Sequence, residues 1–192
     1  IALRNMQTSN KELIDLVQIV LETYKVRDGN IRLYKENILL KGFIKEIIEE
    51  MQPIAQKTNN TLEFIQQRDI RVYADRIQLK RVIKNLIQNA ISYGEPNFPI
   101  EVSIGEIPQY IVIKVKDYGA GISKTDIDKI FNKYYSAAKK FRKIGTGLGL
   151  YLALQIIKSH NGELSVESEE GNFTEFTIKL PAVMNINLHY GE

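Results

Sequence analysis

The chain has 192 residues, of which 44% are hydrophobic and 26% charged, a composition typical of one globular domain with a short additional segment. The net charge of +3 is too small to indicate nucleic-acid binding by itself. The absence of cysteine excludes disulfides and thiolate metal sites, and two histidines far apart in the sequence do not indicate zinc. We find no signal peptide and no apolar run of about 18 residues, so we expect no membrane contact from this sequence.

The sequence starts without Met, and we expect it to be a piece of a longer protein. Residues 3–26 are predicted to form a long helix, because apolar residues recur there at spacings of three and four. They include Leu13, Leu16, Val17, Val20, Leu21 and Tyr24. This helix packs either on its own domain or in an intermolecular bundle, and the pattern favours neither alternative.

Helices and strand pairs are predicted to alternate after the turn RDGN, residues 27–30. In chain order they are β-like pieces within 31–40, a helix at 40–57, strands at 61–67 and 69–74, a helix at 75–93, strands at 99–107 and 110–117, a short helix at 124–131, a helix from the glycines at 145–149 to about 160, and strands at 163–170 and 173–181. Asp75 is the expected N-cap of the second of these helices. Ser123 and Asp126 resemble a capping box, and residues 132–144 are expected to be a basic loop. This order predicts a two-layer α/β sandwich with a mixed sheet, preceded by one long helix.

The stretch GTGLGL, residues 145–150, places three glycines directly before a helix. Free N–H groups and the helix dipole make such a turn suitable for phosphate, and glycine lets a ligand approach the backbone. A crowded corner between a strand and a helix explains the glycines equally well. Two nucleotide fingerprints are excluded, because the sequence contains no G-x-x-x-x-G-K-[ST], and neither 119–124 nor 145–150 fits G-x-G-x-x-G.

Two further features carry polar side chains that suit a nucleotide. Asp117 ends a predicted strand before two glycines, where it would accept a hydrogen bond from an exocyclic amine or simply form a turn. Asn85 and Asn89 lie four residues apart on one helix, so they share a face. That face is either solvated or part of a polar site, in which an amide oxygen suits Mg²⁺.

The sequence resembles the sensor histidine kinases of two-component signalling and the GHKL ATP-binding fold that they share with some topoisomerases and chaperones. NLIQNA is similar to the N box, DYGAGI to the first glycine box, IFNKYY to the F box and GTGLGL to the second glycine box. SHNGELSVES and FTIKLP resemble the closing strands of that domain, and residues 1–26 resemble the second helix of the dimerisation and phosphoacceptor bundle.

The resemblance implies a role for each matching residue. Asn89 would coordinate Mg²⁺, Asn85 would support that site, and Asp117 would bind the adenine amino group. Lys133 would meet the γ-phosphate, and the loop at 132–144 would be a mobile lid, whose Lys139, Lys140, Arg142 and Lys143 are either phosphate contacts or solvated charges. The residues that the resemblance assigns to ATP binding are Asn89, Tyr93, Asp117, Gly119, Gly121, Ile122, Lys133, Tyr134, Gly145, Thr146, Gly147, Leu148 and Gly149.

Three positions depart from the family pattern. Ser92 replaces a frequent lysine, Gln88 replaces a frequent acidic residue, and Phe173 occupies a position that is usually glycine. None of these changes removes the metal ligand or the adenine acceptor. We therefore expect nucleotide binding, with more of the positive charge supplied by the lid.

The resemblance favours a kinase over an ATPase. ATP-hydrolysing relatives carry a glutamate as general base where this chain has Asn85, and an amide takes no proton, so hydrolysis should be slow. Transfer of the phosphoryl group would then rest on positioning and charge. The accepting histidine is expected on a helix before residue 1, because His160 is interpreted as structural and His189 matches nothing. We expect this piece to bind Mg-ATP without phosphorylating itself.

The function expected from the resemblance is the ATP-binding catalytic part of a sensor histidine kinase, which phosphorylates a histidine for relay to an aspartate of a response regulator. The alternatives are a GHKL-type ATPase or serine kinase module, and a nucleotide-binding scaffold without catalysis. The predicted domains are the partial bundle at 1–28, the catalytic domain at 29–184 and a tail at 185–192. The expected partners are ATP or ADP, the receiver domain of a response regulator and, in the full-length protein, a second copy bound through the first helix; no nucleic acid is expected. The expected location is the cytoplasm, with a parent protein that is either soluble or anchored to a membrane.

Overall fold

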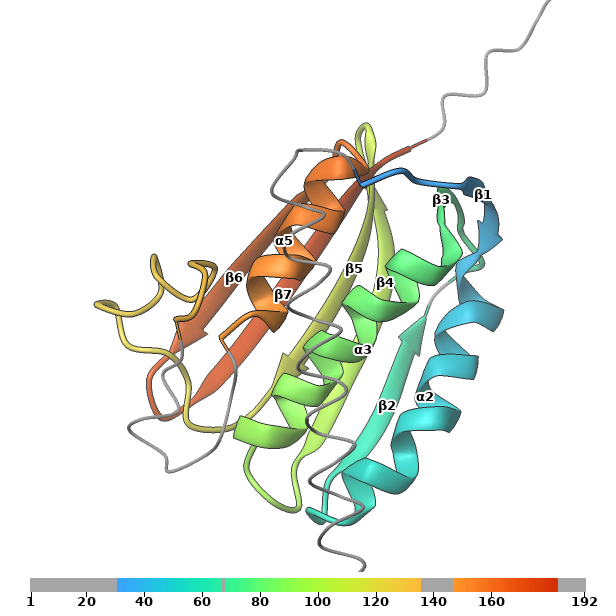
Figure 1. Cartoon of the computed structure of the whole chain (residues 1–192). Coiled ribbons are helices and arrows are strands. Elements are labelled where there is room, and N and C mark those ends of the chain that lie inside the picture. Colours follow the sequence, from blue (N-terminus) through green and yellow to red (C-terminus); the bar gives the residue numbers. More distant parts are fainter. Residues whose placement is uncertain (1–30, 67, 136–146, 183–192) are drawn as a thin grey trace, which may run out of the picture.

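The computed structural model of the chain describes residues 31–66, 68–135 and 147–182. In these ranges, three helices cover one face of a five-stranded sheet (Figure 1). The elements are β1 (Lys35–Leu39), α2 (Leu40–Gln56), β2 (Thr61–Gln66), β3 (Arg71–Asp75), α3 (Arg76–Tyr93), β4 (Pro99–Ile107), β5 (Tyr110–Asp117), α5 (Gly149–Ser159), β6 (Glu163–Glu169) and β7 (Phe173–Pro181). They agree with the predicted sandwich.

The main sheet is mixed, as its sequence pattern predicts. Its strand order is β2-β4-β5-β7-β6, in which β2 runs parallel to β4 and the other neighbours are antiparallel. A separate antiparallel pair, β1 and β3, lies at one end of the helical layer. The β5 strand is therefore central. Its carboxyl end, at Asp117, lies at the edge of the core, next to the last turn of α3.

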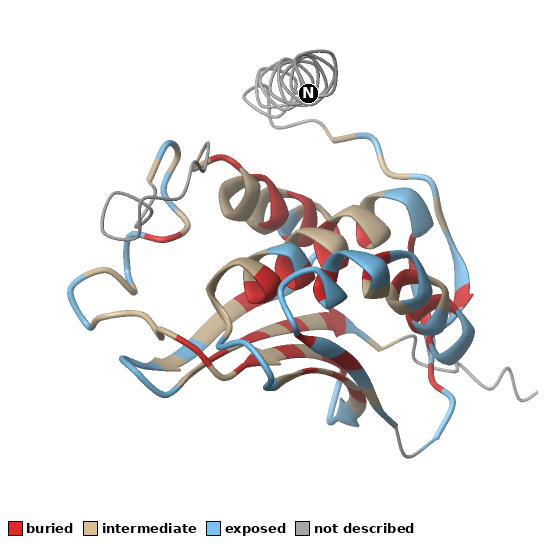
Figure 2. Cartoon of the chain, turned by 90° about the horizontal axis from the view of Figure 1, so that it is seen from below, coloured by how far each residue is buried: buried red, intermediate tan, exposed pale blue. Residues whose placement is uncertain are grey.

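Among the described residues, helices cover one face of the sheet, and the alternation of buried residues in the strands shows which face this is (Figure 2). In β7, Phe176, Ile178 and Leu180 are buried, whereas the residues between them are half-buried on the other face. Apolar side chains of α2 and α3, such as Phe43 and Ile87, complete the core. Each fully buried side chain of this kind stabilises the fold by about 1.5–3 kcal/mol through its removal from water.

The first turn of α3 is fixed by two side chains. Asp75 caps the helix, since its Oδ1 accepts from the Gln78 N–H at 3.0 Å, as the sequence predicts. His160 is buried at the end of α5, and its Nε2 accepts from the Asp75 N–H at 2.9 Å. Its Nδ1 therefore carries the proton and donates to the Ile156 carbonyl at 2.8 Å. Burial lowers the pKa of this imidazole, so His160 is a structural link between α5 and α3.

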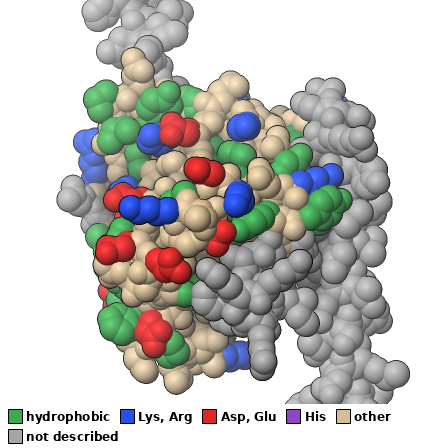
Figure 3. Space-filling model, turned by 90° about the vertical axis from the view of Figure 1, so that its left-hand side faces the viewer, with side chains coloured by type: hydrophobic (Ala, Val, Ile, Leu, Met, Phe, Trp, Pro, Cys, Tyr) green, Lys and Arg blue, Asp and Glu red, His purple; other side chains and the backbone are tan. Residues whose placement is uncertain are grey.

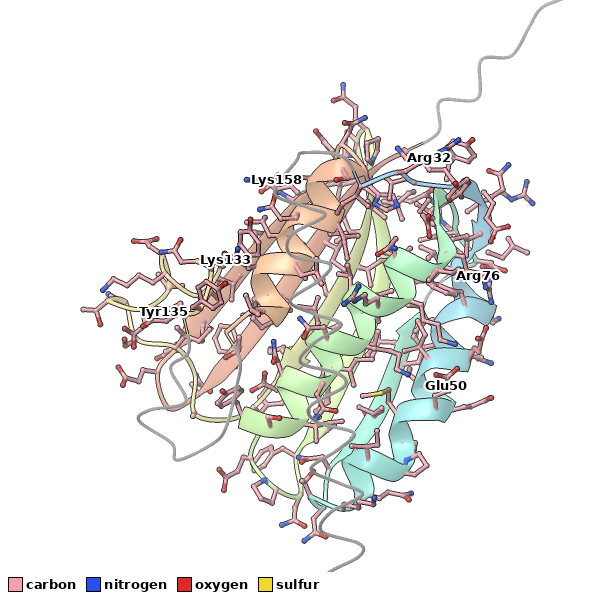
Figure 4. The ribbon with its side chains drawn as sticks, viewed as in Figure 1. Arg32, Glu50, Arg76, Lys133, Tyr135 and Lys158 are labelled. Carbon is pink, nitrogen blue, oxygen red and sulfur yellow. The ribbon has the colours of Figure 1, made fainter. Side chains whose placement is uncertain are left out.

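A row of ion pairs joins the outer surfaces of α2 and α3. Glu46 accepts from Arg76 at 2.5 Å and from Lys80 at 2.7 Å, and Glu50 accepts from Lys80 and, at 3.1 Å, from Lys84. Figure 4 labels Glu50 and Arg76 on this surface. These pairs are largely exposed, so each adds little to stability but together they favour one register of the two helices.

One predicted element is wrong. Residues 124–131 form successive turns instead of a short helix, with hydrogen bonds such as Lys129 N–H to Asp126 O at 2.8 Å and Asn132 N–H to Lys129 O at 2.8 Å. The capping box does not form, because the Ser123 hydroxyl pairs with the Thr125 hydroxyl and the Asp126 carboxylate accepts from the Tyr135 hydroxyl. The predicted helix at 3–26 and the tail at 185–192 lie outside the described residues. Within the described ranges, none of the helices is long and apolar enough to cross a membrane.

Candidate nucleotide site

The predicted site residues gather at two places along α3. The first, which we call the β5 end, comprises Tyr93, Gly94, Asp117, Gly119 and Gly121. The second, the α5 end, comprises Asn85, Asn89, Lys133, Gly147 and Gly149. Figure 1 shows why they are separate, since the carboxyl end of β5 lies below the helices, whereas the first turn of α5 lies beside the middle of α3.

The β5 end is built by backbone packed against backbone. Gly94 and Gly119 form an isolated antiparallel bridge, and the Ala120 N–H donates to the Tyr93 carbonyl at 3.2 Å. A side chain at Gly119 would overlap the Tyr93 carbonyl, and one at Gly94 would come within 2.6 Å of the Ala90 carbonyl. Glycine is needed at both positions because the last turn of α3 lies directly on the loop after β5.

Asp117 is the polar group enclosed by this packing. The residue is 3% exposed, and its Oδ1 is buried without a hydrogen-bond partner. Burial raises the pKa of its carboxyl to about 7. A buried acceptor without a donor is costly, so its presence is a sign of a functional site rather than of stability.

The loop after Asp117 is anchored to the other side of the sheet. The Ile122 N–H donates to the Ser168 hydroxyl at 2.8 Å, and the Gly171 N–H donates to the Ala120 carbonyl at 2.8 Å. Gly121 has a φ of +61°, and a side chain there would overlap the Glu169 carbonyl. These contacts hold the backbone next to Asp117 in one conformation.

At the α5 end, a glycine of the GTGLGL turn meets the first asparagine of α3. A side chain at Gly149, the first residue of α5, would overlap Oδ1 of Asn85. The Nδ2 atom of Asn85 is buried without a partner, so it is a donor that points at no acceptor. The residue before α5, Leu148, makes no side-chain cap hydrogen bond to the helix, whose first turn carries the positive end of the helix dipole. Asn89 is half-buried one turn further along α3.

The loop before the lid is joined to the same turn. The Tyr134 N–H donates to the Gly147 carbonyl at 3.0 Å, and both residues have positive φ, +65° each. A side chain at Gly147 would come within 2.6 Å of the Tyr134 carbonyl carbon. Leu148 is buried beside them, at 2% exposure. The last described residues of this loop therefore contact the turn that precedes α5.

Lys133 is the charged member of the α5 end. Its Nζ lies 5.3 Å from the ring centroid of Tyr134 and 5.9 Å from that of Tyr151, a residue of α5. Figure 4 shows Lys133 between the loop and α5. The described part of the side that carries this loop shows acidic and basic side chains intermixed (Figure 3), so individual cations rather than a broad basic patch supply charge there.

A pocket of about 540 Å³ opens beside the β5 end. Its lining includes Tyr93, Gly94, Gly119 and Ala120, together with Thr58, Asn60, Ile91, Glu95, Pro96 and Gly171. Asn85 and Gly149 do not line it. The pocket therefore adjoins the β5 end and does not reach the α5 end.

Several predicted residues fall outside this description. Gly145, Thr146, Lys139, Lys140, Arg142 and Lys143 lie outside the described residues. Among the departures from the family pattern, Phe173 lies with its ring 5.0 Å from Nζ of Lys116, on the uncovered face of the sheet. Asp117 belongs to the opposite, buried face, so Phe173 does not crowd the site.

The two unpaired atoms fit a nucleotide. Among the described residues, Asn85 Nδ2 and Asp117 Oδ1 are the buried side-chain atoms without a hydrogen-bond partner. Asp117 lacks a donor, which an adenine amino group supplies, and Asn85 lacks an acceptor, which a phosphate supplies. No cluster of three histidines or carboxylates suits a metal within these ranges. A magnesium ion therefore fits only where nucleotide phosphates supply most of its ligands and Asn89 supplies one.

Sequence reasoning missed Gly94, Ser168 and Tyr151. Gly94 follows the last residue of α3, a place where glycine is read as a helix stop, and its close approach to Asp117 is visible only in three dimensions. Ser168 lies in β6, 46 residues from the Ile122 that it anchors. Tyr151 gives no sequence signal, because tyrosine on a helix is an ordinary surface or core residue.

Comparison with known proteins agrees with this geometry. Residues 74–184 match the family model described as "Histidine kinase-, DNA gyrase B-, and HSP90-like ATPase". The chain is 32% identical over 181 residues to the sensor histidine kinase WalK of Bacillus subtilis, which covers 91% of this chain and 29% of that protein. It is 33% identical over 175 residues to the sensor protein kinase WalK of Staphylococcus aureus, covering 89% of this chain and 42% of that one. The chain thus spans less than half the length of these two relatives.

Solved structures show the same fold. The catalytic domain of histidine kinase ThkA superimposes with a TM-score of 0.69 at 28% identity, over 78% of this chain and 97% of that one. The histidine kinase AdeS of Acinetobacter baumannii gives a TM-score of 0.76 at 24% identity, over 90% of this chain and 80% of that one. Full-length ShkA, solved in complex with AMPPNP, gives 0.82 at 22% identity, over 91% of this chain and 36% of that one.

Proposed function

The chain belongs to the family of histidine kinase-, DNA gyrase B- and HSP90-like ATPases, and from this premise we propose that it is the ATP-binding catalytic part of a sensor histidine kinase. It transfers the γ-phosphoryl group of ATP to a histidine side chain outside residues 31–182. The observation that carries the proposal is the pair of unpaired buried atoms, Asp117 Oδ1 at the β5 end and Asn85 Nδ2 at the α5 end.

The β5 end binds the base. Asp117 accepts a hydrogen bond from the exocyclic amine of adenine, and as a buried carboxylate it makes this bond stronger than one between neutral groups. Gly119 and Gly121 let the backbone next to it pack directly against Tyr93 and Glu169. Ile122 and half-buried Tyr93 supply apolar surface nearby. A guanine base offers a carbonyl at the same position, so the site should discriminate between the two purines.

The α5 end binds the phosphates. The first N–H groups of α5 and its dipole attract anions, Asn85 donates from Nδ2, and Lys133 supplies a positive charge for the terminal phosphate. Gly147 and Gly149 let the Tyr134 backbone and the Asn85 side chain pack close to the start of α5, and Leu148 lies between them in the chain. The assignment of Gly145 and Thr146 to the phosphates rests on the sequence motif. Asn89 holds Mg²⁺, which neutralises charge on the phosphates when it is bound.

The residue at position 85 favours transfer over hydrolysis. An asparagine there cannot remove a proton from water, so the site lacks the general base expected of a hydrolase in this family. His160 does not serve as acceptor, because it is buried and both ring nitrogens are hydrogen-bonded. The accepting histidine must therefore be brought to the site. Relay to a response regulator and dimerisation through residues 1–28, in the cytoplasm, complete this proposal.

The proposal is tested by incubating the chain with radiolabelled Mg-ATP and the phosphoacceptor helices of its parent protein. We expect label on the acceptor that is stable to alkali and labile to acid, as phosphohistidine is, and little phosphate release without the acceptor. Steady phosphate release without an acceptor would favour the ATPase alternative. Failure to bind Mg-ATP at all would favour the scaffold alternative.

A further inference from the structure

The last residues of the loop at 124–135 are held by contacts to the turn before α5, to the loop itself and to β7. The Tyr134 N–H donates to the Gly147 carbonyl at 3.0 Å, and the Tyr135 hydroxyl donates to Asp126 at 2.7 Å. The ring of Phe131 meets that of Phe176 edge to face, with centroids 6.4 Å apart. The backbone that carries Lys133 is therefore held on both sides by contacts to the core and to the glycine turn.

The side chain of Lys133 is then directed by two aromatic rings. Its Nζ lies within 6 Å of the centroids of both Tyr134 and Tyr151, the range in which a ring face attracts a cation. Lys133 and Tyr151 are half-buried, whereas Tyr134 is 64% exposed. The interaction with Tyr151 is thus the better shielded from water, and Figure 4 shows Lys133 turned toward α5.

Tyr151 is not needed for the packing of α5. The buried residues of this helix are Leu152, Ala153, Ile156 and Ile157, and Tyr151 is only half-buried on a different face. It lies two residues after Gly149, within the first turn, where the helix attracts anions. A lysine bound to its ring is consequently kept beside the helix start.

We propose that Tyr151, together with Tyr134, is a positioning residue that holds the Lys133 ammonium beside the start of α5, ready for the terminal phosphate of ATP. Lysine has a long flexible stem, and ordering it on binding costs free energy. Two rings that restrain the stem beforehand reduce this cost. The inference deepens the proposed function and rests on it, since it adds a role to a residue that no nucleotide motif includes.

The test compares the affinity for a non-hydrolysable ATP analogue with that for ADP, measured by calorimetry at fixed Mg²⁺. Because Lys133 meets only the terminal phosphate, loss of its positioning should weaken the ATP analogue and leave ADP unchanged. We expect Tyr151→Leu to reduce the preference for the ATP analogue about two- to fivefold, and Tyr151→Phe, which keeps the ring, to retain it. Tyr73→Leu, an exposed tyrosine of β3, is the matched control.

The variant Lys133→Met distinguishes the role of Tyr151 from the proposed function on which that role rests. If Tyr151 acts through Lys133, the double variant Lys133→Met with Tyr151→Leu should have the same preference as Lys133→Met alone. An unchanged or increased preference in Tyr151→Leu, while Lys133→Met lowers it, would overturn the role of Tyr151 only. An unchanged preference in Lys133→Met would remove the phosphate role of Lys133 and the inference with it. Absence of nucleotide binding by the unaltered chain would overturn the proposed function itself.

Discussion

The β5 end and the α5 end of the site are built in different ways. At the β5 end, three backbone segments meet through glycines and enclose a carboxyl that has one unpaired oxygen. At the α5 end, a helix start, an amide from α3 and a lysine held by aromatic rings come from elements that contact one another through side chains. The first arrangement is rigid and recognises a ligand through one hydrogen bond. The second brings together the partial positive charge of a helix start and the full positive charge of a lysine.

This difference suggests a division of labour. A rigid, water-excluded acceptor discriminates between ligands, because a ligand without the matching donor leaves the acceptor unpaired. A set of donors and charges beside a helix start binds any phosphate and responds to its charge. Changes at the β5 end should therefore affect all adenine nucleotides alike, and changes at the α5 end should depend on phosphate number and on Mg²⁺.

The largest expected effect concerns the cost of enclosing Asp117. Burial raises the pKa of this carboxyl from 3.8 to about 7, so the folded chain binds its proton more tightly than the unfolded chain does. The free energy of unfolding from this group is therefore greatest below about pH 4, falls by up to about 4 kcal/mol as the pH rises to 7, and is constant above. Denaturant unfolding from pH 4 to 8 should show this fall in the unaltered chain and not in Asp117→Asn. If the free energy of unfolding changed with pH in the same way in both proteins, the role of Asp117 in this fall would be contradicted.

The next effect is the loss of base recognition. Asp117→Ala removes the acceptor, and we expect the affinities for ADP and for ATP to fall together by about 10- to 100-fold, the usual value for a hydrogen bond to a charged group. Calorimetry measures both. The control is Glu36→Ala, an exposed carboxylate of β1. A loss of affinity for ATP alone would mean that Asp117 acts on the phosphates, which would contradict the proposed division of labour between the two ends.

The α5 end is tested by its dependence on the metal. Asn89→Ala removes the proposed magnesium ligand, and we expect about a tenfold loss of ATP affinity in Mg²⁺, the lower range for changes near a metal. With EDTA present, the variant and the unaltered chain should bind ATP equally weakly. Equal losses with and without Mg²⁺ would assign Asn89 to the phosphates or the base instead.

The last prediction separates the effect of close packing from the effect of backbone conformation. Gly147 and Gly171 both have positive φ, +65° and +78°, but only Gly147 has backbone within 4 Å of the place of a side chain. Alanine at Gly171 should lower the free energy of unfolding by about 1–2 kcal/mol through φ alone. Gly147→Ala should cost more and also weaken nucleotide binding, because it displaces the Tyr134 backbone. Similar behaviour of the two variants would show that the contact does not matter.

Much of this arrangement follows from local sequence. Apolar periodicity predicts α2, α3 and every strand of the sheet, and Asp75 and His160 have the structural roles that their positions indicate. The motifs also predict Asn85 and Asp117 as site residues, and the structure shows one buried unpaired atom in each of them. The confirmed elements and the roles of Asp75 and His160 share one cause, because each depends on spacing along the chain or on a single side chain beside its own element.

The features that the sequence does not predict depend on contacts between distant segments of the chain. The helix predicted at 124–131 does not form: the Asp126 carboxylate pairs with Tyr135, and Ile122, just before this segment, is joined to β6 through Ser168. Phe173 stands where the family usually has glycine, and the structure shows that its position in β7 turns it to the face opposite Asp117. The pairing of Lys133 with Tyr151 joins a loop to a helix across residues that carry no shared pattern.

The central claim, that Asp117 reads the amino group of adenine, is tested most directly by comparing ADP with purine riboside diphosphate, which lacks only that amine. Calorimetry gives the affinities of the unaltered chain and of Asp117→Ala for each of the two ligands, and these four values form a complete thermodynamic cycle. We predict that the unaltered chain binds ADP at least about tenfold more tightly than the analogue, and that Asp117→Ala binds both equally weakly. Equal binding of ADP and the analogue by the unaltered chain would contradict the account.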